Sequence, residues 1–181
     1  MKRLAFLFLF LVVLCAPSCQ AGSSSQSARQ NFSVNIPEGW NRFSSSEYFM
    51  LTREGVFSQY ILVLQRRVNK PFSHTKKTLK KDMPPEEVAG IILDEMNFDD
   101  NLLNFKTIEY IPTRVGRYNG FRIVFRYEDK AGRKFRTIFC GILEGSWFYS
   151  LRYCAQEAKY SDKDLEDFKK VVNSFNIVMD K

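Results

Sequence analysis

The sequence predicts an α/β fold: an α/β/α sandwich around one mainly antiparallel sheet of about six or seven strands, with two main helices. Several segments alternate apolar with polar residues and are joined by short turns, which indicates antiparallel strands. Other segments are apolar on both faces, which indicates strands that are covered on both sides. Two segments far apart in the chain place their apolar residues at helical spacing, so two helices can cover the two faces.

Three strands are predicted before the first helix. Residues 32–36 alternate strictly between apolar and polar side chains, and turn residues interrupt the pattern at 37–40. Residues 47–52 and 57–68 flank an Arg-Glu-Gly turn and predict a hairpin. Within it, residues 60–64 are apolar on both faces, which predicts a central strand.

The first helix is predicted over residues 84–97. Two prolines and two glutamates occupy its first turn, where proline fits the backbone and acids complement the helix dipole. Its apolar residues fall on one face: Val88, Ile91, Ile92 and Met96.

Four strands and a second helix are predicted in the C-terminal half. The strands are residues 105–115, 121–128, 135–143 and 147–155. The last two are joined by a predicted turn at Glu144-Gly145. Ser161, with Asp164 three residues later, approximates a capping box. The buried stripe of the helix is predicted to be Leu165, Phe168, Val172 and Phe175.

The N-terminal residues 1–21 predict a secretion signal of the lipoprotein type. Two basic residues precede an apolar run that ends at Leu14, too short for the roughly 20 residues of a membrane-spanning helix. Cys19 follows a small residue, as in a bacterial lipobox, which predicts lipidation of Cys19 and a stable membrane anchor. The alternative is ordinary cleavage after Ala21.

Two further segments follow the signal. Residues 22–30 have no periodicity and predict a flexible tether. Residues 31–181 suit one globular domain, because the chain is 45% hydrophobic and 15% aromatic. We therefore expect an exported, periplasm-facing and membrane-anchored lipoprotein, with a soluble periplasmic or secreted protein as the alternative.

The charge of the chain points to anionic partners outside the cytoplasm. The formal net charge is +7, from 27 basic and 20 acidic residues. An exported basic protein meets membrane or cell-wall anions, so we expect no nucleic-acid partner. Five lysines without an intervening acid lie in the loop predicted over residues 69–83: Lys70, Lys76, Lys77, Lys80 and Lys81. They are the candidate binding site for an anionic lipid or lipopolysaccharide surface, and the alternative is a solvated loop.

No catalytic, metal or cofactor site is predicted. His74 is the only histidine, and its neighbour Ser73 cannot form a nucleophile–base pair with it, because adjacent loop side chains rarely face each other. Cys140 and Cys154 flank the predicted turn at Glu144-Gly145. An export compartment permits a disulfide, but that turn places the two cysteines on opposite faces. The sequence leaves open whether they pair or remain buried thiols.

Parts of the sequence resemble PsbP-like domains. Residues 32–40 run from a strand into Pro-Glu-Gly-Trp, and residues 168–177 end a helix in Ser-Phe, as this family does. Residues 120–127 and 147–153 lie where the family has long hairpins. The resemblance spans about residues 31–178 and extends to the DcrB-like lipoproteins of the Mog-PsbP superfamily. It implies an α/β/α sandwich and a binding or assembly role without catalysis. No position matches a metal site or a Ran-binding surface of that superfamily.

Three functions remain open at this stage. The first is a non-enzymatic envelope lipoprotein that binds a protein partner or helps to assemble a complex. The second is a periplasmic module that binds a small ligand or a lipid. The third is a hydrolase, for which no nucleophile–base pair is visible.

Overall fold

The structure is a computed structural model, and it describes residues 30–43 and 48–178. The predicted secretion signal, the predicted lipidation at Cys19 and all but the last residue of the predicted tether lie outside the described residues. Among the helices that are described, none is long and apolar enough to cross a membrane.

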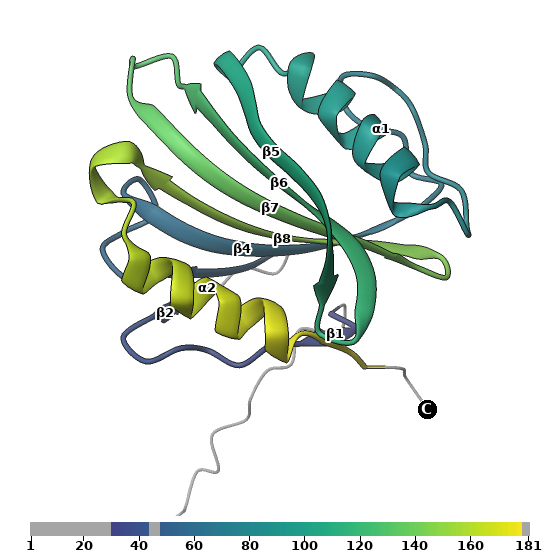
Figure 1. The fold of residues 1–181 in the computed structure, drawn as a ribbon, viewed down its shortest axis with the longest axis horizontal. Coiled ribbons are helices and arrows are strands. Elements are labelled where there is room, and N and C mark those ends of the chain that lie inside the picture. Colours follow the sequence, from purple (N-terminus) through teal and green to yellow (C-terminus); the bar gives the residue numbers. More distant parts are fainter. Residues whose placement is uncertain (1–29, 44–47, 179–181) are drawn as a thin grey trace, which may run out of the picture.

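A seven-stranded antiparallel sheet forms the centre of the domain (Figure 1). Its strands are β2 (Asn41–Phe43), β3 (Phe49–Thr52), β4 (Gln59–Arg67), β5 (Leu103–Val115), β6 (Tyr118–Glu128), β7 (Lys134–Glu144) and β8 (Trp147–Gln156). Their order across the sheet is β2-β3-β4-β8-β7-β6-β5. The chain therefore leaves the middle of the sheet after β4, crosses to the far edge, and returns through three hairpins until β8 pairs with β4.

Two helices cover the two faces of this sheet. Helix α1 (Pro85–Asn97) packs on β5, β6 and β7, and α2 (Asp162–Ser174) lies on the opposite face and contacts β5 and β8 (Figure 1). A short 3-10 helix, η1 (Glu157–Lys159), precedes α2. Each face buries its own apolar cluster. The predicted α/β/α sandwich, the number of strands and the two main helices are confirmed.

The helices begin where their sequence signals predict. Pro84 is the N-cap residue of α1, and the buried side of that helix includes Val88, Ile92 and Met96. Ser161 caps α2, where its Oγ accepts a hydrogen bond from the backbone N–H of Asp164 at 3.3 Å.

The first predicted strand is shorter than expected and does not join the main sheet. Only Phe32–Ser33 forms a strand, β1, and it pairs with β9 (Asn176–Ile177) in a separate two-stranded sheet. Phe32 stacks on Phe175 with 5.9 Å between the ring centroids, so this small sheet closes the core below α2. The alternating pattern indicates an extended chain, but it cannot indicate which partner that chain pairs with.

The turn between β7 and β8 lies one residue later than predicted. Glu144 pairs with Trp147, so Gly145 and Ser146 form the loop, and Gly145 takes a φ of 55° that favours glycine. The two cysteines face opposite sides of the sheet, as the predicted turn implied. Both are buried and free, so they form no disulfide.

Candidate functional site: an open groove beside helix α1

Helix α1 covers only part of its face of the sheet. Its packing is concentrated on β5, β6 and β7, and β4 and β8 lie beside it. A groove of about 1540 Å³ opens over β4 and β8, and Met96 of α1 is among its lining residues.

Strand pairing determines which side chains form the floor of this groove. Leu64 of β4 pairs with Ser150 of β8, and Arg66 pairs with Phe148. Because side chains two residues apart share a face, Arg152 lies on the same side of the sheet. The floor therefore combines the apolar Leu64 and Phe148 with the hydroxyl of Ser150, and an arginine lies toward each end.

The walls come from segments that are distant in the sequence. Ile92 and Met96 of α1 line one side, and Phe72 and His74 of the loop between β4 and α1 extend it. On the other side, the chain at Asn31 lines the groove, close to where the described residues begin.

Arg66 is held in place by the loop above it. Its guanidinium carbon lies 3.7 Å from the centroid of the Phe72 ring, and its Nη2 donates a hydrogen bond to the carbonyl of Lys70. Burial lowers the pKa of Arg66, and the nearby Glu95 carboxylate opposes that change. Its Nε is buried and has no hydrogen-bond acceptor in the part of the chain that the structure describes.

Arg152 is also without a carboxylate partner. Its guanidinium carbon lies 5.5 Å from the centroid of the Phe139 ring, and its buried Nε has no acceptor among the described residues. No ion pair of Arg66 or Arg152 with a carboxylate occurs within residues 30–43 and 48–178. The groove therefore offers two guanidinium groups that form no ion pair with a carboxylate of the described residues, and the Glu95 carboxylate lies near Arg66.

Hydrogen bonds to α1 fix the loop that forms the groove wall. The Glu95 carboxylate accepts bonds from the backbone N–H groups of His74 and Thr75 and from the Thr75 hydroxyl, each at 2.9 Å. Burial alone would raise the pKa of Glu95, but these hydrogen bonds and the nearby His74 lower it below its ordinary value. Lys77 adds an ion pair with Asp94 at 2.6 Å.

His74 lines the groove, but no catalytic arrangement surrounds it. Its Nε2 lies 3.7 Å from Asp99 Oδ1. No hydroxyl or thiol is hydrogen bonded to its ring within the described ranges. The same ranges hold no group of three or more His, Cys, Asp or Glu residues that could bind a metal ion.

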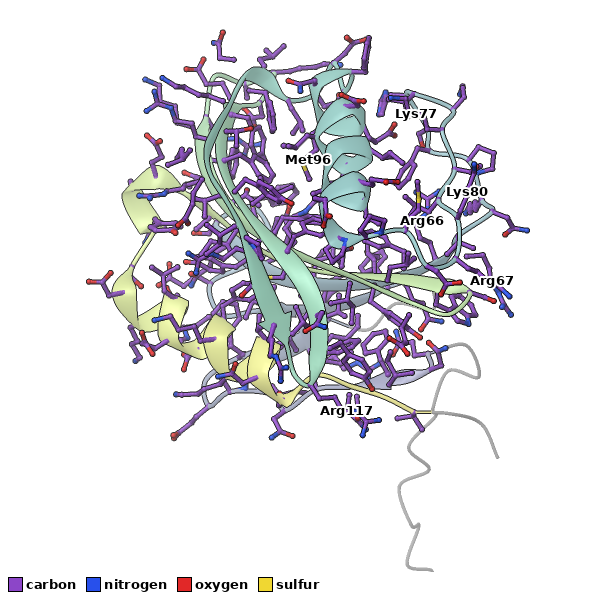
Figure 2. The ribbon with its side chains drawn as sticks, turned by 45° about the vertical axis from the view of Figure 1, so that its right-hand side comes forward. Arg66, Arg67, Lys77, Lys80, Met96 and Arg117 are labelled. Atoms are coloured by element: carbon purple, nitrogen blue, oxygen red, sulfur yellow. The ribbon has the colours of Figure 1, made fainter. Side chains whose placement is uncertain are left out.

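The five lysines of the predicted anionic-surface site are exposed but do not converge. Lys70 lines the groove, Lys76 donates to the Ser73 carbonyl at 2.7 Å, and Lys77 is paired with Asp94. Lys80 and Lys81 follow further along the loop. Figure 2 shows Lys77 and Lys80 spread along this loop, with Arg66 and Arg67 at the end of β4 below it. Binding of these lysines to an anionic surface stays a prediction.

Comparison with known proteins shows a likeness of structure. No protein-family model and no curated protein matches the chain. LpqN of Mycobacterium tuberculosis, described as involved in cell envelope biogenesis, superposes with a TM-score of 0.57 and 12% identity, over 82% of this chain and 83% of LpqN. PsbP of the cyanobacterium Synechocystis gives a TM-score of 0.54 and 12% identity, over 90% of this chain and 99% of that protein. The described domain has a PsbP-like fold.

A further solved structure, from Bacteroides thetaiotaomicron, has a TM-score of 0.49 and 12% identity. That match spans 83% of this chain but only 46% of the other protein.

The likeness to LpqN and to cyanobacterial PsbP confirms the PsbP-like fold that was expected from residues 32–40 and 168–177.

The sequence interpretation missed the two groove arginines of this PsbP-like domain. Arg66 lies in the predicted strand 57–68, after its apolar run at 60–64. Arg152 lies in the predicted strand 147–155, and each arginine interrupts its strand with a charge. That interruption was a usable signal, because a charged side chain in a covered strand indicates a site or a gap in the cover. The pairing of β4 with β8, which brings the two arginines to one floor, was not readable from the sequence.

Proposed function

We propose that the protein is a non-enzymatic module of the cell envelope that binds a protein partner through the groove beside α1. The observation that carries this proposal is the open groove beside α1, where a floor of mixed apolar and polar side chains lies between two arginines. An open groove of this kind on a sheet face is a suitable docking surface.

The size of the groove favours a polypeptide segment over an enclosed small molecule. Small-molecule pockets usually have volumes of about 300–1,000 Å³ and surround most of their ligand. This groove is larger, at about 1540 Å³, and one side of it is open. An extended or helical segment of a partner can lie along β4 and β8 with its outer side in solvent.

The chemistry of the floor defines the partner segment. Leu64 and Phe148 would contact apolar side chains of the partner segment, and Arg66 and Arg152 would bind carboxylates near its two ends. Arginine binds carboxylates through two parallel hydrogen bonds, which gives geometric specificity as well as affinity. We therefore expect an amphipathic segment with acidic residues.

The envelope location is supported by two observations. LpqN, whose structure resembles this domain, is described as involved in cell envelope biogenesis. Residues 1–21 carry the predicted secretion signal. A PsbP-like domain that is exported in this way would meet its partner at the membrane surface.

A second candidate is the binding of a lipid or another apolar ligand. The observation in its favour is the apolar floor beside α1, where Phe139, Phe148 and Met96 lie together. An acyl chain would use that floor and leave the arginines for its head group. The two candidates differ in what a crosslinker in the groove would capture.

The test is site-specific photocrosslinking of the full chain in its native envelope. A photoreactive residue at Leu64 should give one discrete protein adduct, and the same residue at Ile36, which is exposed outside the groove, should not. Arg152→Glu should reduce the Leu64 adduct about a hundredfold, because the reversed charge would face the partner's carboxylates at a cost of several kcal/mol.

Arg114→Glu is the matched control, because Arg114 is an exposed arginine on β5 outside the groove. It should leave the adduct unchanged, and unaltered melting curves should show that each variant folds. Equal adducts at Leu64 and Ile36 would contradict partner binding in the groove. Lipid adducts alone at Leu64 would favour the second candidate.

A further inference from the structure

Three basic side chains form a row across the face of the sheet that α1 does not cover. Lys106 of β5 pairs with Arg126 of β6, and Arg126 pairs with Arg136 of β7. The neighbours of Arg126 in its strand, Phe125 and Tyr127, pack into the apolar cluster below α1. Arg126 and the two residues in register with it therefore point to the opposite face, the side of α2.

Helix α2 leaves this end of the sheet open. It meets β5 at the turn after that strand, where the Gly116 N–H donates to the Val172 carbonyl at 2.8 Å. Lys106 lies at the other end of β5. Figure 1 shows the upper ends of β5, β6 and β7 rising beyond α2.

No carboxylate neutralises the row. Within residues 30–43 and 48–178, none of the three side chains forms an ion pair. The acids on the same face are bound elsewhere: Glu109 pairs with Arg122 at 2.8 Å and Glu128 with Lys134 at 4.0 Å. The row is thus a local excess of positive charge, not one part of a salt-bridge network.

This arrangement has a cost in the free protein. Residues directly opposite in antiparallel strands have Cβ atoms about 4.5–5.5 Å apart, and like charges at that separation destabilise the pair. The row contains two such contacts in succession, Lys106 with Arg126 and Arg126 with Arg136. An anion placed over the row would remove both repulsions.

The Arg136 guanidinium is held in one orientation by a neighbouring aromatic ring. Its guanidinium carbon lies 4.7 Å from the centroid of the Tyr160 ring, which fixes the plane of the group. Its Nε is buried and has no acceptor within the described part of the chain. A guanidinium whose plane is fixed in this way is suited to bind an oxyanion through the paired hydrogen bonds of its Nη groups.

We propose that Lys106, Arg126 and Arg136 bind a phosphate group, carried either by a small phosphorylated molecule or by a phospholipid. The three Cα atoms span about 10 Å across two strand spacings, and the long side chains can converge on one tetrahedral anion above the sheet. Two arginines supply forked donors and the lysine adds a point charge. This site lies on the opposite face from the groove and does not depend on the function proposed for it.

The test measures thermal unfolding of the full chain with inorganic phosphate or glycerol 3-phosphate, against chloride at equal ionic strength. A ligand that binds only the folded state raises the melting temperature, and the rise grows with the logarithm of the ligand concentration relative to the dissociation constant. We expect both phosphates to stabilise the protein, and Arg126→Gln and Arg136→Gln each to weaken binding about tenfold.

A parallel experiment uses vesicles of phosphatidylglycerol. If the phosphate is that of a lipid head group, the row variants weaken vesicle binding, and the vesicles stabilise the protein more than the soluble phosphates do. If the site takes a small phosphorylated molecule, the soluble phosphates alone reproduce the effect. Arg114→Gln, from the same β5–β6 hairpin, is the matched control and should bind as the unchanged protein does.

A second measurement guards against variants that are merely misfolded. Without phosphate and at low salt, Arg126→Gln should melt at the same temperature as the unchanged protein or higher, because it relieves the repulsion. A lower melting temperature would contradict the repulsive row. The proposal is overturned if neither phosphates nor vesicles respond to the row variants, or if Arg114→Gln loses as much binding as Arg126→Gln.

Discussion

Arg53 ties the C-terminal helix to the other half of the sheet. Its Nη1 contacts Asp164 Oδ1 and its Nη2 contacts Asp167 Oδ2, each at 2.6 Å. Trp40 Nε1 donates to the same Asp167 carboxylate at 3.1 Å. Both aspartates are buried, which acidic residues rarely are unless they are paired in this way. The sequence predicted Asp164 only as the partner of Ser161 in an approximate capping box. The predicted buried stripe was purely apolar, so it missed Asp167 and the contact of Arg53 with both aspartates.

The Asp167 network should make folding stability depend on acid pH. Burial alone would raise the pKa of Asp167, but hydrogen bonds from Lys170, Trp40 and Arg53 bring it below the ordinary value. A lowered pKa means that the stabilisation is fully present above the unfolded-state pKa of about 3.9 and is lost as pH falls further. Asp167→Asn should cost about 1–3 kcal/mol at pH 7.

Chemical denaturation between pH 3 and pH 7 would measure both effects. The Asp167→Asn variant should lose less stability than the unchanged protein as the pH falls below about 4, since it has no proton to gain at that position. Glu166→Gln is a suitable control, because Glu166 is exposed on the same helix. A variant that follows the same pH curve as the unchanged protein would contradict this assignment.

The elements themselves were largely predictable, because each carries a local signal. The proline and acidic first turn mark α1, the serine cap marks α2, and alternation marks the long hairpins. The incorrect predictions concern segments whose structure depends on which strands pair with each other. Residues 32–36 alternate, but Phe32–Ser33 pairs with the end of the chain, and the short strand Asn41–Phe43 is exposed and has no apolar pattern. Register and partner choice depend on residues far along the chain.

The lysine loop between β4 and α1 leads to a prediction at the scale of an element. Replacing Lys76, Lys77, Lys80 and Lys81 with glutamate should remove weak binding to anionic vesicles at about 0.05 M salt. The melting temperature should change little. Only Lys77 has an ion pair with a carboxylate in the described residues, and half-exposed pairs of that kind contribute about 0–1 kcal/mol.

Two comparisons make this experiment selective. Raising the salt to about 0.5 M should abolish the binding of the unchanged protein, because the Debye length then falls well below 10 Å. Arg126→Gln tests the opposite face and should leave loop-dependent binding in place. If the unchanged protein shows no vesicle binding at low salt, the loop is simply solvated.

At the scale of the whole molecule, the two helices leave two different surfaces uncovered. One is the groove over β4 and β8, and the other is the row of cations at the upper ends of β5, β6 and β7. Neither was predictable from the sequence, because each is assembled by pairing between strands. A run of lysines in one loop is visible in a sequence, whereas a row with one cation from each strand becomes visible only when the register is known.

The predicted anchor determines how these surfaces meet the envelope. Cys19→Ser should convert a protein that needs detergent for extraction into a soluble form or an unprocessed precursor. Incorporation of labelled fatty acid measures the modification directly, and Cys15→Ser is the matched control. A lack of label in the unchanged protein would show that the alternative, cleavage after Ala21, applies.

The small β1–β9 sheet brings the two ends of the described chain together. Val178 N–H donates to the Asn31 carbonyl at 2.9 Å, next to the pair formed by Phe32 and Ile177. The backbone between these two positions is therefore close to a closed ring, and a cut in another loop could replace the break between them. A short linker across those ends and a new cut at the Gly132 turn would give a circular permutant that retains every strand pair of the main sheet. Fusion partners could then be attached at the far end of the molecule from β1 (Figure 1).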